Sequence, residues 1–140
     1  MIAIGYDSAG VDLAQHIKGH LDKKGLLYKD FANSVDGNDY PDFGDAVAQA
    51  VLVGDCERGI LICGTGIGIS IAANRHKGIR CALCHDTFSA KATREHNDAN
   101  ILALGGRVIG VGPALEILDA FLATDASAEE RHKRRVGKLG

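Results

Sequence analysis

The chain of 140 residues has no tryptophan, one methionine and two prolines, and aromatic residues make up only 5% of it. No apolar run approaches the roughly 18 residues of a membrane-spanning helix, and no N-terminal segment has the basic, apolar and small-residue parts of a signal peptide. The net charge is −2, so the chain lacks the positive field typical of proteins that bind nucleic acid or anionic membranes. We expect a cytoplasmic protein that binds neither nucleic acid nor membrane.

Cysteine is also scarce, with four residues at positions 56, 63, 81 and 84. They lie in or beside apolar, strand-like runs, which favours reduced thiols over a disulfide scaffold. Cys81 and Cys84 have the spacing of a redox or zinc pair, but no second pair of this spacing follows.

His16 and His20 have helical metal-ligand spacing without a nearby third ligand, which favours a solvated helix face. We therefore expect no metal site.

The hydrophobic residues, 46% of the chain, are enough for one core, and we expect a single domain over residues 1–140. Apolar runs that read as strands alternate with segments of helical periodicity throughout. The expected strands are 1–6, 26–31, 59–63, 79–84 and 100–104, and the expected helices are 11–24, 43–53, 68–75, 89–97 and 113–123. This alternation predicts an α/β fold: a Rossmann-like three-layer α/β/α sandwich with a five-stranded parallel sheet.

A glycine-rich turn follows the third expected strand, where Gly64-Thr65-Gly66-Ile67-Gly68 comes directly after Cys63. The pattern matches neither a P-loop nor a dinucleotide-binding fingerprint. Three alternating glycines leave a row of N–H groups uncovered, and a helix N-terminus attracts negative charge. The turn therefore predicts a cradle for a phosphate or an oxyanion.

Three further candidate site residues each have two possible roles. Cys63 is either a buried small hydrophobe or a base beside a helix N-terminus, where a thiolate is stabilised. Asp7, at the end of the first strand, either caps the next helix or binds a substrate hydroxyl. His96, which we place on a loop before the fifth strand, is either a solvated residue or a catalytic one.

The segment 127–140 is dense in charge and has almost nothing to bury. It is either a frayed end or an arm that docks on another surface. If it is helical, Arg131 and Arg135 lie on one face, four residues apart, where two guanidinium groups can bind one phosphate.

These residues together resemble the ribose-5-phosphate isomerase B and galactose-6-phosphate isomerase family over essentially the whole chain. The resemblance rests on several motifs in order: Asp7, Asp39-Tyr40-Pro41, the segment 59–74, Gly78-Ile79-Arg80, the segment 94–100, Gly105-Gly106-Arg107, Arg131-His132 and Arg135-Val136.

The resemblance implies a cofactor-free aldose–ketose isomerase of carbohydrate metabolism that converts ribose 5-phosphate to ribulose 5-phosphate in the pentose phosphate pathway. It makes Cys63 the base that forms a cis-enediolate, and Thr65 and His96 the ring-opening pair. The residues it places against the substrate are Asp7, Ser8, Gly64, Gly66, Ile67, Gly68, Asn97, Arg107, Arg131 and Arg135. The two C-terminal arginines clamp phosphate in the neighbouring subunit, which implies a homodimer or a dimer of dimers with shared active sites.

The chain departs from the family pattern at two places. Ser8 stands where ribose-specific members usually have histidine, which leaves open a six-carbon substrate such as allose or galactose 6-phosphate. Glu129 and Glu130 stand where members often have two glycines, and carboxylates beside the clamp weaken anion binding unless they point away. A non-catalytic phosphate-binding module is the other alternative, but binding alone has no need of Cys63.

Overall fold

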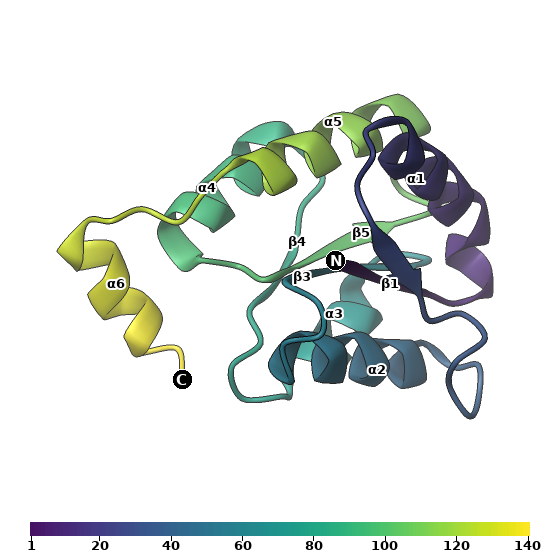
Figure 1. Ribbon diagram of the computed structural model, residues 1–140, viewed down its shortest axis with the longest axis horizontal. Helices are drawn as coiled ribbons and strands as arrows, with labels where there is room; N and C mark the ends of the chain where they lie inside the picture. The colour runs from purple at the N-terminus through teal and green to yellow at the C-terminus, as the bar shows by residue number, and fades with distance from the viewer.

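The computed structural model describes residues 1–140 and is built on one parallel sheet of five strands in the order β2-β1-β3-β5-β4 (Figure 1). The strands are β1 (Ile2–Tyr6), β2 (Tyr28–Asp30), β3 (Arg58–Cys63), β4 (Cys81–Leu83) and β5 (Ile101–Gly105). All residues of β1 and β5 are buried, as is typical of parallel strands that are covered on both faces.

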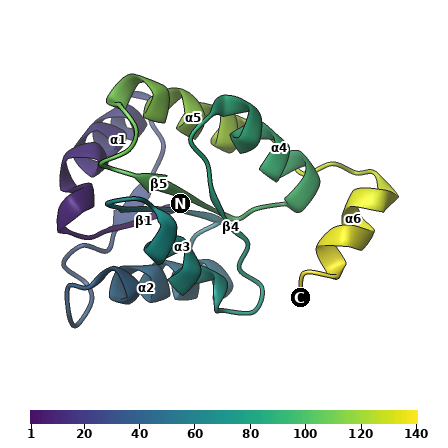
Figure 2. The same cartoon turned by 180° about the vertical axis from the view of Figure 1, so that it is seen from behind.

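Helices cover the two faces of this sheet, as Figures 1 and 2 show from opposite sides. They are η1 (Ser8–Gly10), α1 (Val11–Lys23), α2 (Tyr40–Leu52), α3 (Ile67–Asn74), α4 (Thr87–Asn97), α5 (Val111–Ala123) and α6 (Glu130–Gly137). Helices α1, α4 and α5 lie on one face, and α2 and α3 lie on the other. The predicted Rossmann-like three-layer fold is confirmed.

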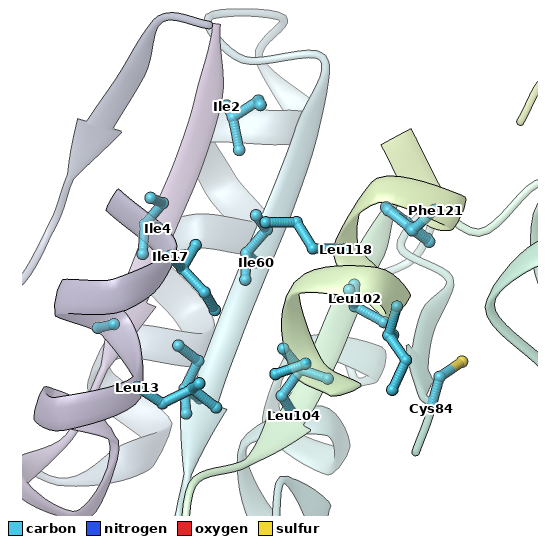
Figure 3. Close-up of a cluster of buried hydrophobic side chains, with 14 of the residues drawn as sticks. Ile2, Ile4, Leu13, Ile17, Ile60, Cys84, Leu102, Leu104, Leu118 and Phe121 are labelled. Carbon is cyan, nitrogen blue, oxygen red and sulfur yellow. The ribbon is translucent and has the colours of Figure 1, made fainter. Parts of the chain in front are cut away.

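Each face has its own hydrophobic cluster. The larger one joins α1 and α5 to the sheet, with Ile17, Leu118 and Phe121 fully or almost fully buried against β1, β3 and β5 (Figure 3). The other cluster includes Val47 of α2 and Ile69 of α3. Alternate residues of β1, β3 and β5 supply the two clusters, because successive side chains of a strand point to opposite faces.

The predicted elements are all present, but some of their bounds were wrong. Helix α2 begins at Tyr40 rather than at residue 43, because Asp39 and Asp42 form a reciprocal capping box and Pro41 occupies the first turn. β2 and β4 are the edge strands of the sheet, and each is shorter than its apolar run. No helix has both the length and the hydrophobicity that a bilayer crossing requires.

The spacing of Cys81 and Cys84 does not bring their thiols together, because Cys81 packs with one core cluster and Cys84 with the other. Both are free cysteines. Burial raises the pKa of the Cys81 thiol far above its ordinary value, and burial raises the pKa of Cys84 to about 11. Both side chains are therefore protonated thiols that contribute to packing.

Candidate functional site

The carboxyl ends of β1, β3 and β5 meet at one edge of the sheet. Tyr6 is in register with Ile62, and Cys63 with Gly105. The segments that follow these strands therefore lie together, and we call their candidate residues the carboxyl-edge set. Its members are Asp7, Ser8, Cys63, Gly64, Thr65, Gly66, Ile67, Gly68 and Arg107.

Cys63 is buried at the end of β3, and its Sγ accepts a hydrogen bond of 3.2 Å from the N–H of Gly66. Gly66 has a φ of +78° and directly precedes α3. A Cβ on Gly66 would lie 2.8 Å from the carbonyl carbon of Leu104, so only glycine allows this turn. The close approach of the turn to β5 thus directs an N–H group at the sulfur atom.

The turn also leaves N–H groups free at the surface. Those of Gly64 and Thr65 donate to no group of the chain. Ile67 donates to Thr65 Oγ1 at 3.2 Å, and Gly68 lies in the first turn of α3, where N–H groups have no intrahelical acceptor. These donors lie next to Cys63, which is the arrangement that an oxyanion cradle requires.

Asp7 and Arg107 flank the turn. Asp7 Oδ1 accepts a hydrogen bond of 3.0 Å from the N–H of Ala9, so the capping role is present, and its other oxygen accepts none from the chain. The N–H of Arg107 donates to the carbonyl of Gly64 at 2.9 Å, and a Cβ on Gly64 would lie 3.6 Å from Arg107 Nη1. A carboxylate and a guanidinium group thus both lie at the end of the sheet that carries the cradle, and Ser8 is exposed beside Asp7.

His96 and Asn97 lie elsewhere. The predicted helix end at residue 97 is confirmed, and our placement of His96 on the loop before the fifth strand was wrong, because both residues form the last turn of α4. Arg94, which is 5% exposed, holds this helix end by donating to Thr124, Asp98 and the carbonyl of Ala99. The helix therefore extends to Asn97 and presents His96 to solvent.

The C-terminal segment is not a frayed end, and it contacts the rest of its own chain. It forms α6, which lies beside α4 of the same chain at one end of the molecule (Figures 1 and 2). The N–H of Ser127 donates to Glu95, and His132 is buried. Arg131 and Arg135 are exposed, four residues apart on the helix. We call His96, Asn97, Arg131 and Arg135 the α4–α6 set.

Glu129 does not point away from this set. Its Oε2 accepts a hydrogen bond of 2.7 Å from Arg131 Nε, so one of the two predicted phosphate ligands is already paired. Glu130 makes no ion pair. Only the first of the two unusual carboxylates therefore competes with an anion for this arginine.

The two sets occupy opposite edges of the sheet. β5 starts at Ile101, which is in register with Gly59 at the start of β3, and ends opposite Cys63. His96 precedes the start of β5, whereas the cradle follows the end of β3. A five-residue strand spans about 13 Å, so one chain does not bring Cys63 and His96 together.

One candidate that sequence reasoning left without a role is Tyr40. A Cβ on Gly68 would lie 2.6 Å from Tyr40 Cε1, so the ring covers this end of the cradle. Tyr40 also lines a cavity of about 520 Å³ with Ile71, Arg75 and His76. The capping box and Pro41 are the sequence signal for a helix that begins at Tyr40.

The fold and the turn define an α/β protein with a candidate site for an anionic small molecule at the carboxyl ends of its strands, and comparisons with known proteins identify its family. The family model described as Ribose/Galactose Isomerase matches residues 2–139. The putative sugar phosphate isomerase YwlF of Bacillus subtilis is 53% identical, over 99% of this chain and 93% of that protein.

Two other similar proteins have more specific names. The D-erythrulose-4-phosphate isomerase of Pectobacterium atrosepticum is 49% identical, over 86% of this chain and 81% of that protein. The solved structure of ribose-5-phosphate isomerase B from Clostridium thermocellum is 52% identical with a TM-score of 0.93, over 99% of this chain and 94% of that one. The chain therefore belongs to the Ribose/Galactose Isomerase family, and it is a sugar-phosphate isomerase.

Proposed function

We propose that the protein interconverts ribose 5-phosphate and ribulose 5-phosphate, with Cys63 as the base. The observation that carries this proposal is the position of its sulfur atom, in hydrogen-bond contact with Gly66 and next to the free N–H groups of Gly64 and Thr65. A base must remove a proton from the carbon beside a carbonyl, and donors must stabilise the oxyanion that forms. One turn supplies both requirements.

The chemical steps then follow. Ring opening breaks the bond between C1 and the ring oxygen. His96 donates a proton to that oxygen, and the C1 hydroxyl gives its own proton to solvent through the Thr65 hydroxyl. Cys63 takes the proton from C2 of the open aldose, which gives a cis-enediolate. Cys63 then returns the proton to C1, and a second proton moves from O2 to O1, which gives the ketose. No cofactor enters these steps.

The separation of the two sets supports a homodimer as the active form. In an isologous pair, the carboxyl-edge set of each chain meets the α4–α6 set of the other, which completes two sites at once. Arg131 and Arg135 then bind the phosphate in the partner's site. Docking of residues 127–140 on the partner, and the choice between a dimer and a dimer of dimers, stay predictions.

An exposed apolar surface supports the same pairing. Phe88 is 80% exposed in the first turn of α4, and Ile67 and Ile71 are more than half exposed on α3. Leu83 lies close to Gly66, since a Cβ there would be 2.6 Å from Leu83 Cδ1. These residues flank the carboxyl-edge set, where a second chain can bury them.

A substrate of another length is the second candidate. One relative at 49% identity is named for a four-carbon sugar phosphate, and the family description includes galactose. Ser8 is exposed beside Asp7, where its small side chain leaves room that a histidine would fill. The same chemistry therefore serves a tetrose or a hexose phosphate if the phosphate reaches the arginines.

The test is an isomerase assay with chelator present on ribose 5-phosphate, erythrulose 4-phosphate, allose 6-phosphate and galactose 6-phosphate. We expect the highest kcat/KM on the pentose. A preference for another sugar would refute the pentose assignment, and tight anion binding without turnover would refute the proposed reaction.

A pair of variants tests the base. Cys63→Ala should abolish turnover and leave sugar-phosphate affinity nearly unchanged, since the N–H donors remain. Cys81→Ala, which removes a thiol from the other end of the sheet, is the matched control and should keep wild-type turnover. If Cys63→Ala retained most of its turnover, another group would be the base.

A further inference from the structure

His132 is the single buried residue of α6, with 9% of its surface exposed. Its ring stacks on that of His96, with 4.6 Å between the ring centroids and 34° between the ring planes. His96 is otherwise exposed at the end of α4. The ring of His132 therefore covers one face of the His96 imidazole.

This contact is made by the ring face and not through the buried nitrogen. His132 Nδ1 is buried and has no hydrogen-bond partner. The nearest carboxylate oxygen, Glu129 Oε2, is 3.9 Å away and accepts from Arg131 instead. A buried aromatic ring that contacts a neighbouring ring favours a fixed packing geometry with it.

A fixed geometry matters for a proton donor. An imidazole in the last turn of a helix rotates between several rotamers, whereas proton transfer requires the donor within hydrogen-bond distance of the reacting oxygen. The stack removes orientations that would overlap His132. Because α6 also carries Arg131 and Arg135, the same contact sets the position of the proton donor relative to the phosphate clamp.

We propose that His132 is a positioning residue, whose ring orients His96 for ring opening in the site of the neighbouring chain. The inference rests on the proposed function, because it assigns His132 to the step that His96 performs. It predicts an effect on ring opening that is separate from the proton abstraction at Cys63.

The experiment compares a reaction that needs ring opening with one that does not. Ribose 5-phosphate is a furanose, whereas ribulose 5-phosphate cannot form a furanose because its C5 hydroxyl is phosphorylated. Isomerisation of the aldose therefore includes ring opening. Exchange of the C1 hydrogen of the ketose with deuterium from D2O, followed by NMR at saturating substrate, reports the Cys63 step alone.

His132→Ala should lower kcat for ribose 5-phosphate about tenfold or more and change the exchange rate less than about twofold. His132→Phe keeps a ring against His96 and should restore most of the kcat. His16→Ala, on the exposed face of α1, is the control for removal of an unrelated imidazole. Unchanged isomerisation in His132→Ala, or equal losses in both reactions, would overturn the proposal.

An NMR measurement separates this inference from the proposed function. The stack places the His96 ring protons near the face of His132, so the Hε1 resonance of His96 should shift in His132→Ala and stay in place in His16→Ala. A wild-type enzyme without pentose activity would refute the proposed function, and an unmoved His96 resonance would refute the stacking role by itself.

Discussion

Cys63 and His96 lie at opposite edges of one parallel sheet, because Cys63 ends β3 opposite Gly105 whereas His96 precedes the start of β5. Both belong to the motifs on which the resemblance to the family rests, and neither reaches the other within the chain. The proposed reaction thus depends on a second copy.

Mixing two inactive variants tests this dependence. Cys63→Ala and His96→Ala homodimers should each lack turnover. Subunits exchanged in an equal mixture should regain about one quarter of wild-type activity, since half of the dimers are mixed and one of their two sites is intact. The assay is the isomerisation rate before and after mixing. In the control, subunits that carry both Cys63→Ala and His96→Ala replace one of the two single variants, so that no mixed dimer has an intact site. A mixture that stayed inactive after proven exchange would place each site within one chain.

Gly66→Ala should damage the cradle and the fold together. A left-handed backbone costs a non-glycine residue about 1–2 kcal/mol, and the new Cβ would also meet the Leu104 backbone at 2.8 Å. We expect a loss of at least this size in the free energy of unfolding, measured with urea, along with a loss of turnover. Gly19→Ala is the control: nothing lies within 4 Å of a Cβ there, and it should stabilise α1 by about 0.5–1 kcal/mol. Equal effects at both glycines would contradict the close approach.

Glu129→Gln should strengthen phosphate binding. The Glu129–Arg131 ion pair measures 2.7 Å, but both side chains are about 60% exposed, so the pair is weak. Freeing Arg131 should lower KM for the sugar phosphate about two- to fivefold, and the gain should shrink as salt is added. Glu130→Gln removes a similar charge without an ion pair and should have the smaller effect. Equal changes in both variants would mean that net charge, and not the pair, sets the affinity.

Acid stability should depend on Asp30. Burial opposes its ionisation, but hydrogen bonds from Lys18, Ala32 and Tyr6 at 2.7–2.8 Å outweigh burial and hold the pKa of Asp30 below its ordinary value. Because the folded pKa is lowered, the stabilisation is complete above about pH 5 and is lost as the pH falls through the ordinary pKa of about 3.9 and then the folded one.

Asp30→Asn should therefore lower the free energy of unfolding at pH 7 by about 1.5–3 kcal/mol and flatten its decline below pH 5. Chemical denaturation at several pH values measures both effects. Asp36→Asn, in an exposed loop without a hydrogen-bond partner, should leave the profile unchanged. A steeper acid decline in Asp30→Asn would show that the sign of this argument is wrong.

Much of the carboxyl-edge set could be predicted from sequence. Parallel strands place their ends at one edge, so the order of apolar runs is enough to bring Asp7, Cys63 and Arg107 into one region. Helix starts were harder: α2 and α4 begin at Tyr40 and Thr87 rather than at residues 43 and 89, because the capping residues Asp39 and Asp86, and not apolar periodicity, set where these helices begin.

The sequence by itself determined the layers, the alternation of strands and helices, and the glycine turn. These follow from periodicity and from the backbone freedom of glycine. Tertiary structure alone decided that Cys63 and His96 lie at opposite edges, that α6 packs on α4, and that His132 meets His96. The physical reason is that such relations depend on strand register and on contacts between residues far apart in the chain, which no local pattern encodes.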